Sequence, residues 1–395
     1  MRVSNLESRL GRLAVRSLVA LAVCALFSSL PLTVAVAGEN TRSRAERALR
    51  EGEFELAEKL FHELLLKDAH DNDARLGLSY ALYKQRKLVD AYDHAARVLA
   101  NDPLSSRAHA ILGTVILASG DFRMSVEEFR TALSLNPDEA LAIAGLGMVD
   151  FYENRTASAV ERLRRAFALN SNEPDFIFNL AQAAARSERY KEAAAAYERF
   201  LIIAPRTDED RRARIRGLID FLRYLGSQSG LYEASGAGET SVSFELPNDR
   251  PIIKVHVNGR KESLRFVLDT GSGISVISEE TAKHLGLHAV ARGGMARAVG
   301  GKFEIVYGFL DSLEIGEVRV DRVPVYIRRF YNDEFPVDGY IGLAAIGKYI
   351  ATVDYGARTF SLRKQHSVND FPAPSPAAIE IPIRSTSSGF LSGEV

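Results

Sequence analysis

Small residues recur every 34 positions between residues 41 and 205. One series comprises Ala45, Ser79, Gly113, Gly147 and Ala181. A second series begins 12 residues later and comprises Ala57, Ala91, Ser125, Ala159 and Ala193. Residues that end helices keep the same interval: Pro103, Pro137, Ser171 and Pro205. Because two small residues per unit let two helices approach closely, the pattern predicts about five units, each a pair of antiparallel helices.

An unrelated helical bundle would not keep three such series in phase. The segment therefore resembles a tetratricopeptide-repeat array over residues 41–205, and the resemblance implies a surface that binds a peptide or protein partner. Residues 206–225 predict one further helix that caps the array, with an arginine-rich side facing solvent. Residues 226–240, rich in Gly and Ser, predict a flexible linker.

Beyond residue 240 the apolar positions alternate as in strands, which predicts a nearly all-β domain over residues 241–365. The predicted strands are 241–246, 252–257, 264–268, 274–277, 303–309, 318–327 and 350–354. Short helices are predicted near 279–285 and 344–349. Asn258-Gly259 is a signal for a tight turn between two of the strands.

Residues 366–395 predict a linker followed by the start of a second β lobe. The basis is a Pro-rich stretch at 372–376, and then Ile379-Glu380-Ile381-Pro382, which is similar to Phe244-Glu245-Leu246-Pro247. The alternative is a disordered tail. The predicted fold class is thus multidomain: an all-α repeat solenoid followed by an all-β lobe.

Composition narrows the classes of function. The chain is 46% hydrophobic and 26% charged, with a net charge of -1, which excludes wholesale disorder and a multi-span membrane protein. It lacks the basic character that nucleic-acid binding favours. No cofactor is predicted, and His284 and His288 have no third ligand that would make a metal site.

The first 37 residues predict a cleaved export signal. Arginines precede an apolar run from Ser17 to Leu30, and Ala35-Val36-Ala37 offers a small-x-small cleavage site. An uncleaved anchor and lipoprotein processing at Cys24, the single cysteine, are the alternatives. The expected location is the bacterial periplasm or the exterior, with no membrane span left after cleavage.

The candidate chemistry lies at Phe266-Val267-Leu268-Asp269-Thr270-Gly271-Ser272-Gly273. An apolar strand here delivers one carboxylate into a turn of small residues, and a second apolar strand leaves it. A charge at the end of a buried strand is costly unless something solvates or uses it. Asp338-Gly339-Tyr340-Ile341-Gly342 supplies a second apolar segment with glycines.

Together these two segments resemble the retropepsin-like aspartic peptidases. The resemblance implies that Asp269 is the catalytic carboxylate in a loop with Thr270, Gly271 and Ser272. It also implies that Tyr340, Ile341 and Gly342 pack beneath that loop. Val299, Gly300 and Gly301 match the hairpin flap that covers substrate in this family, and an ordinary exposed hairpin is the alternative.

Peptide hydrolysis by this family needs two carboxylates, and the chain shows one Asp-Thr-Gly. The second acid is expected from a homodimer through the β lobe or from a tandem lobe. The sequence therefore predicts an exported aspartic endopeptidase, a hydrolase that acts on peptide or protein substrates recruited by the repeats. The alternative is a catalytically silent binding module.

Overall fold

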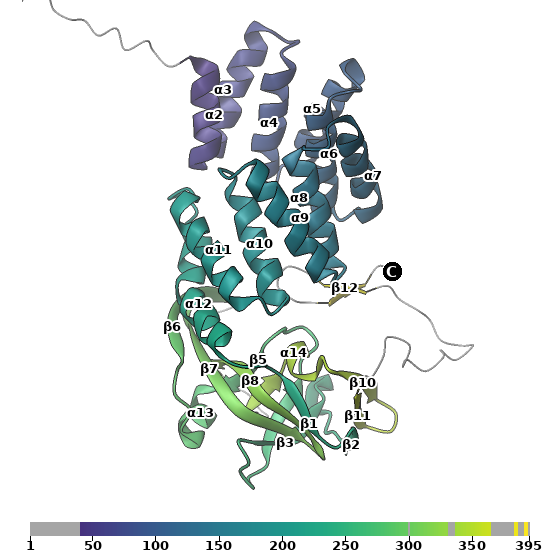
Figure 1. The fold of residues 1–395 in the computed structure, drawn as a ribbon, viewed down its shortest axis with the longest axis vertical. Helices are drawn as coiled ribbons and strands as arrows, with labels where there is room; N and C mark the ends of the chain where they lie inside the picture. Colours follow the sequence, from purple (N-terminus) through teal and green to yellow (C-terminus); the bar gives the residue numbers. More distant parts are fainter. Residues whose placement is uncertain (1–39, 299–300, 331–335, 365–382, 386–390, 394–395) are drawn as a thin grey trace, which may run out of the picture.

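The computed structural model describes residues 40–298, 301–330, 336–364, 383–385 and 391–393. Figure 1 shows a stack of helices above a β domain. The predicted export signal, residues 1–37, lies outside the described residues. Within the described part of the chain, no helix has both the length and the apolar character that crossing a membrane requires.

Five helix pairs, counted over the described residues, form the repeat array. They are α2 (Thr41–Glu51) with α3 (Phe54–Lys67), α4 (Asn72–Lys84) with α5 (Leu88–Asn101), α6 (Ser106–Ser119) with α7 (Phe122–Leu135), α8 (Ala140–Tyr152) with α9 (Thr156–Leu169), and α10 (Pro174–Arg186) with α11 (Tyr190–Ile203). This arrangement confirms the predicted helical repeats.

Both series of small residues are buried, as their spacing predicted. The Ser79 hydroxyl donates to the Ala91 carbonyl at 2.6 Å, which ties the two helices of one unit at their small positions. A Cβ at Gly113 would lie 2.8 Å from the Phe129 ring. The helices are therefore as close as their residue sizes allow, and larger side chains would separate them.

The helix after the array, α12 (Glu209–Ser227), does more than cap it. Its arginines were predicted to face solvent, which is wrong for two of them. The Arg211 guanidinium pairs with Asp175 of α10 at 2.7 Å. The Arg212 guanidinium donates to the carbonyls of Leu201 and Ala204, at the end of α11. Both arginines thus hold α12 on the array.

The β domain is built on a sheet that closes on itself. Among the described strands the order is β1-β8-β5-β9-β4-β3-β7-β6, and β7 also pairs with β8, so six strands from β8 to β7 form a barrel. The bounds are β1 (Glu233–Gly236), β3 (Ile252–Val257), β4 (Leu264–Leu268), β5 (Ser275–Ser278), β6 (Ala291–Ala298), β7 (Gly301–Ile315), β8 (Val318–Arg328) and β9 (Gly339–Ile341). The predicted all-β lobe is confirmed.

Smaller elements complete the domain. A three-stranded sheet has the order β10 (Tyr349–Asp354), β11 (Thr359–Lys364) and β2 (Glu239–Ser243). The short helices are η1 (Pro247–Asp249), α13 (Glu279–Leu285) and α14 (Leu343–Ile346). The strands β12 (Ile383–Ser385) and β13 (Leu391–Gly393) pair antiparallel in the region where the sequence predicts the start of a second lobe. The second lobe itself remains a prediction.

The predicted flexible linker at 226–240 is wrong. It contains the end of α12, all of β1 and the start of β2. Strand β1 pairs with β8 from Glu233↔Asp321 to Gly236↔Val318. Leu231 and Tyr232 just before it are 4% and 7% exposed, in the same apolar core as the barrel strands. Gly and Ser content predicted flexibility, but backbone pairing with β8 and two large apolar side chains fix the segment.

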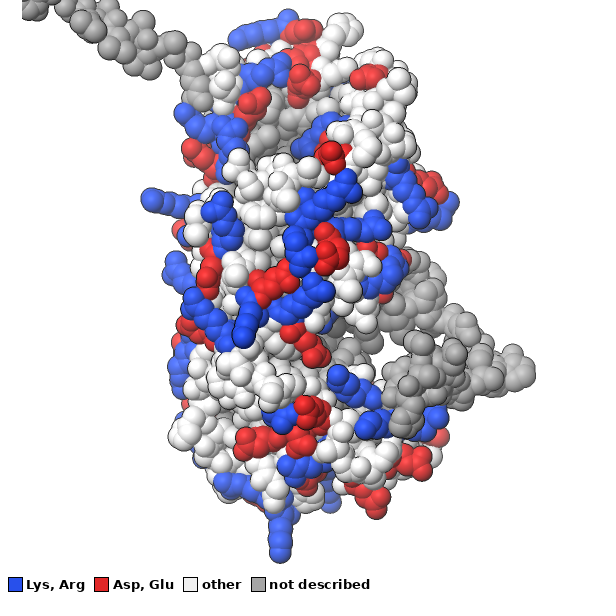
Figure 2. All heavy atoms as spheres, viewed as in Figure 1, with Lys and Arg blue, Asp and Glu red and all other residues white. Residues whose placement is uncertain are grey.

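Acidic and basic side chains are interspersed over the molecule. Figure 2 shows both signs on the array and on the β domain, and on this face neither part is covered by one sign of charge. Such a surface exerts little long-range field, in keeping with the net charge of -1.

Candidate active site

Asp269 lies where β4 ends, at the start of a short loop that leads to β5. The Gly271 amide donates to its Oδ1 at 3.0 Å, and the Ser272 hydroxyl donates to its Oδ2 at 2.6 Å. The Ser272 amide donates to the Asp269 carbonyl at 3.3 Å. Two donors from its own loop thus fix the orientation of the carboxylate. This confirms that the sequence motif folds into one compact turn.

The loop is partly open to solvent. Asp269, Gly271 and Ser272 are half-buried, and Thr270 is exposed. Leu268 and Ile274 on either side are half-buried as well. A carboxylate that is anchored from within its loop and still reachable from outside can contact a water molecule or another protein group.

Strand β9 supports the loop from beneath. It lies between β4, to which it is parallel, and β5, to which it is antiparallel. The Asp269 amide donates to the Ile341 carbonyl at 3.0 Å. The Gly342 amide donates to the Ser275 hydroxyl at 3.0 Å. The backbone of Ile341 therefore contacts the Asp269 loop, that of Gly342 contacts the start of β5, and Tyr340 lies beside them in β9.

Helix α14 completes this support. The amides of Leu343 and Ala344 donate to the carbonyls of Ser272 and Gly273, at 2.8 and 3.0 Å. These are the first backbone N–H groups of α14, which have no partner inside the helix. The loop carbonyls satisfy them, so the turn of small residues and the short helix stabilise each other.

Two glycines allow the close packing of β9. A Cβ at Gly342 would lie 2.6 Å from the Ile274 carbonyl carbon, and one at Gly339 would lie 2.5 Å from the Val276 carbonyl oxygen. Both contacts are with backbone, which cannot move away as a side chain can. The glycines of Asp338-Gly339-Tyr340-Ile341-Gly342 are thus required by the crossing of β9 and β5.

Asp338 proves to be a structural residue, which the sequence left open. Its Oδ2 accepts from the Arg265 amide at 2.8 Å, and its Oδ1 accepts from the Thr281 hydroxyl at 2.9 Å. Its own amide donates to the Arg265 carbonyl at 2.8 Å. Asp338 therefore joins β4, β9 and α13. Ser275, which is 1% exposed, was also missed, because a lone serine in a strand carries no signal.

The predicted flap corresponds to a hairpin. Strands β6 and β7 pair antiparallel, and the last pair is Ala298↔Gly301. Gly301 begins β7, whereas Val299 and Gly300 lie outside the described residues. The hairpin is confirmed, and its role as a flap remains a prediction. Among the described residues, no group of three or more His, Cys, Asp or Glu is arranged to hold a metal ion.

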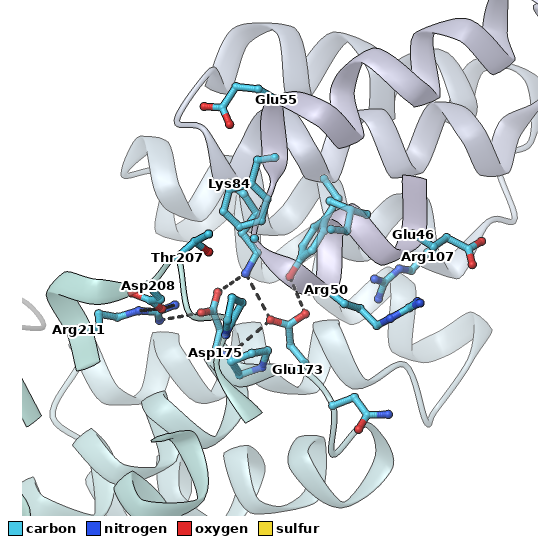
Figure 3. A pocket seen from close by; sticks show the side chains of 17 residues that line it. Glu46, Arg50, Glu55, Lys84, Arg107, Glu173, Asp175, Thr207, Asp208 and Arg211 are labelled. Carbon is cyan, nitrogen blue, oxygen red and sulfur yellow. Dashed lines mark hydrogen bonds and ion pairs between the residues drawn. The ribbon is translucent and has the colours of Figure 1, made fainter. Parts of the chain in front are cut away.

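A separate cavity of about 540 Å³ lies in the repeat array, away from Asp269. Figure 3 shows the Lys84 ammonium pointing toward Asp175 and Glu173. The distances from Lys84 Nζ are 2.5 Å to Asp175 and 3.3 Å to Glu173. The Arg211 guanidinium reaches Asp175 from the other side at 2.7 Å. We call Lys84, Asp175 and Arg211 the clasp.

Coulombic attraction outweighs burial in the clasp. Burial by itself would raise the pKa of Asp175, but the charges of Lys84 and Arg211 hold this pKa far below its ordinary value. Burial would lower the pKa of Lys84, and Asp175 with its neighbours leaves that pKa well above its usual range. All three groups are therefore charged at neutral pH. The sequence did not predict the clasp, because its members lie on α4, α10 and α12.

Comparison with known proteins agrees with this description. Residues 253–345 match the aspartyl protease family. Residues 48–114 and 144–207 match tetratricopeptide repeats. A curated relative, the peroxisomal targeting signal receptor of Kluyveromyces lactis, is 36% identical over 86 residues, which are 21% of this chain and 15% of the relative. This chain therefore spans only a small part of that relative's length.

Solved structures similar to this chain include tetratricopeptide proteins. A thermophilic TPR protein of Thermus thermophilus has 22% identity and a TM-score of 0.38, and the match covers 44% of this chain and 95% of that protein. The pilF protein of Pseudomonas aeruginosa has 18% identity and a TM-score of 0.34, with coverages of 47% and 86%. The family matches, taken with the fold, show that the chain joins a tetratricopeptide-repeat array to a domain of the aspartyl protease family.

Proposed function

We propose that the chain is an aspartic endopeptidase and that Asp269 is its catalytic carboxylate. The observation that carries the proposal is the Asp269 loop itself. The carboxylate is held by the Gly271 amide and the Ser272 hydroxyl, the loop rests on β9, and the group stays half-buried rather than enclosed. An ionised carboxylate so held can take a proton from a water molecule while that water attacks a peptide carbonyl.

A second carboxylate has to complete the reaction. The carbonyl oxygen needs a proton donor, and two acids held close share one proton because both do not ionise comfortably together. The donors to Asp269 among the described residues come from its own loop. We infer that the second acid comes from another copy of this chain across a two-fold axis or from a tandem lobe.

The repeat array would bring a peptide or protein to the β domain. Tetratricopeptide repeats generally mediate protein–protein interaction, and residues 48–114 and 144–207 match that family. A peptide substrate is extended and needs binding energy beyond the scissile bond to be positioned. We propose that the array recruits the substrate or a regulatory partner.

Export is also part of the proposal. It rests on the basic, apolar and small-residue order of residues 1–37. N-terminal sequencing of the protein purified from a bacterial envelope fraction is expected to begin at Gly38. A chain that retains Met1 inside the cell would contradict the export signal.

The competing proposal is a catalytically silent module that binds proteins. The observation in its favour is the single Asp-Thr-Gly. Dependence of activity on concentration separates the candidates. An active site shared by two copies gives a specific activity that rises with protein concentration, a tandem lobe gives a constant one, and a silent module gives none.

Replacement of the candidate catalyst is the direct test. Asp269→Asn keeps the size of the side chain and removes its ability to accept a proton, so cleavage of an unfolded protein at acidic to neutral pH should fall by about a hundredfold or more. Asp311→Asn is the matched control, because Asp311 is an exposed aspartate of the same domain. Equal activity of Asp269→Asn and the parent protein would exclude Asp269 as the catalyst.

A further inference from the structure

Helix α12 belongs to two hydrophobic cores. Ile215, Ile219 and Leu222 pack into the core of the array. Phe221 and Leu225 pack into the core of the β domain, where they are 0% and 4% exposed. A helix that buries one side in each of two domains cannot shift without disturbing both, because packed interiors contain little free space.

The contact of α12 with β6 is made by backbone. A Cβ at Gly217 would lie 2.5 Å from the Arg292 carbonyl oxygen and 2.6 Å from the Gly294 amide nitrogen. A Cβ at Gly294 would in turn lie 2.9 Å from the Arg214 carbonyl oxygen. Glycine on both sides thus removes any flexible side chain from this contact, and a movement of α12 is passed directly to the strand.

The pairing of β6 with β7 is irregular at the same place. The register shifts between Arg292 and Gly294, and Gly293 has a φ of +102°. One helical turn further along α12, the Phe221 ring stacks on Tyr307 of β7, with 4.5 Å between ring centroids. The helix therefore holds both strands of the hairpin at the position of their bulge.

The other end of α12 is held by the clasp. Lys84 and Arg211 both bind Asp175, and Arg211 also binds Asp208 at 2.7 Å through its Nε. These cations already have carboxylate partners, so they do not form a vacant anion site. Their effect is to fix the start of α12 against α4 and α10.

We infer that α12 couples the array cavity to β6, so that loosening the clasp loosens the hairpin of β6 and β7. Two states are involved, one with the clasp formed and one with it open. A partner in the cavity that binds one of them better shifts both ends together. On the proposed function, this hairpin leads to the predicted flap, and array occupancy would then change substrate binding.

Hydrogen exchange of the full chain, read by mass spectrometry, tests the coupling without any catalytic assay. Asp175→Asn removes the shared anion, while Lys84 keeps Glu173 and Arg211 keeps Asp208. Amides of residues 291–298 should then exchange about threefold faster or more, with β11 unchanged. Gly145→Ala is the control, since its Cβ would overlap the Phe129 ring and disturb the array away from α12.

Coupling is reciprocal, which supplies a second variant. Gly217→Ala pushes α12 and β6 apart, and faster exchange is expected in residues 208–215 as well as in 291–298. Unchanged exchange of β6 in Asp175→Asn would overturn the inference, as would equal loosening of β6 by Gly145→Ala. If Asp175→Asn does not fold, the exchange of Gly217→Ala tests the inference by itself. Faster exchange in β6 with unchanged exchange in residues 208–215 would refute the coupling.

A kinetic measurement links the inference to the proposed function. If the hairpin helps to hold substrate, Asp175→Asn should raise KM with little change in kcat. A normal KM beside a clear change in exchange would leave the coupling intact and count against the flap. Absence of activity in the parent protein would count against the proposed function alone, because the exchange result does not depend on it.

Discussion

At the scale of single residues, hydrogen bonds distinguish two aspartates that each lie at one end of an apolar strand, Asp269 after β4 and Asp338 before β9. Asp338 accepts from Arg265 and Thr281 and thereby joins separate elements. Asp269 accepts from Gly271 and Ser272 within its own turn and stays half-buried. The hydrogen bonds of the Asp338 carboxylate hold separate elements of the fold together. The Asp269 carboxylate is oriented by its own turn but can still contact a water molecule or a substrate.

We predict that Asp338→Ala lowers the free energy of unfolding by about 1–3 kcal/mol, because it leaves the Arg265 amide and the Thr281 hydroxyl without their acceptor. Denaturant unfolding of the full chain measures the change. Asp311→Ala, at an exposed position of the same domain, should shift the midpoint far less. A midpoint for Asp338→Ala that matches this control would show that the carboxylate is not structural.

At the scale of elements, α12 is a helix that follows the array and also contributes side chains to the core of the β domain. The Phe221 ring is fully buried and stacks on Tyr307, while Tyr224 contacts Phe309 at 5.6 Å between ring centroids. Aromatic pairs of this kind contribute packing beyond the area they bury. The β domain therefore uses α12 as part of its own core.

We predict that Phe221→Ala costs about 3–5 kcal/mol of stability, since it opens a cavity between α12 and β7. Phe221→Leu keeps most of the apolar volume and should cost under about 1.5 kcal/mol. Thermal unfolding followed by calorimetry compares the two variants. A small loss for both, under about 1.5 kcal/mol, would mean that the site collapses around a smaller side chain and that the stacked ring matters little.

At the scale of the whole molecule, the clasp makes stability depend on pH. The pKa of Asp175 is lowered in the folded protein, since Lys84 and Arg211 outweigh the opposing effect of burial. A lowered carboxylate pKa contributes stability that is complete above the unfolded value, about 3.9, and is lost as the pH falls below it. The pKa of Lys84 is raised in the folded protein, so its contribution to stability is present at neutral pH and is lost only at strongly alkaline pH.

We therefore predict that acid destabilises the array below about pH 4, and that Asp175→Asn reduces this dependence. Melting temperatures measured from neutral pH to about pH 3 should fall more steeply for the parent than for the variant. Parallel curves for the two proteins would contradict the assignment to Asp175. On the proposed function, unfolding of the array in acid would set a lower pH limit for the peptidase activity.

Several features follow from the local sequence. The 34-residue interval identified the helix pairs. Small residues are needed where the two helices of a unit meet, and these helices are neighbours in the sequence. The Asp269 turn was predictable for the same reason: its hydrogen bonds join residues within three positions of each other. Strands β3 and β4 matched their predicted bounds because alternation over five or six residues is a clear signal.

Tertiary structure decided the rest, because the partners are distant in sequence. Strand β9 has three residues, too few for a period, and is defined by β4 and β5 on either side. Strand β1 has a polar, glycine-containing sequence and exists by pairing with β8. The clasp joins residues as far as 91 and 36 positions apart. Periodicity along the chain determined the helix pairs and the longer strands. Only the folded chain decided that β1 and β9 form and which charges and backbones meet, because these depend on partners distant in sequence.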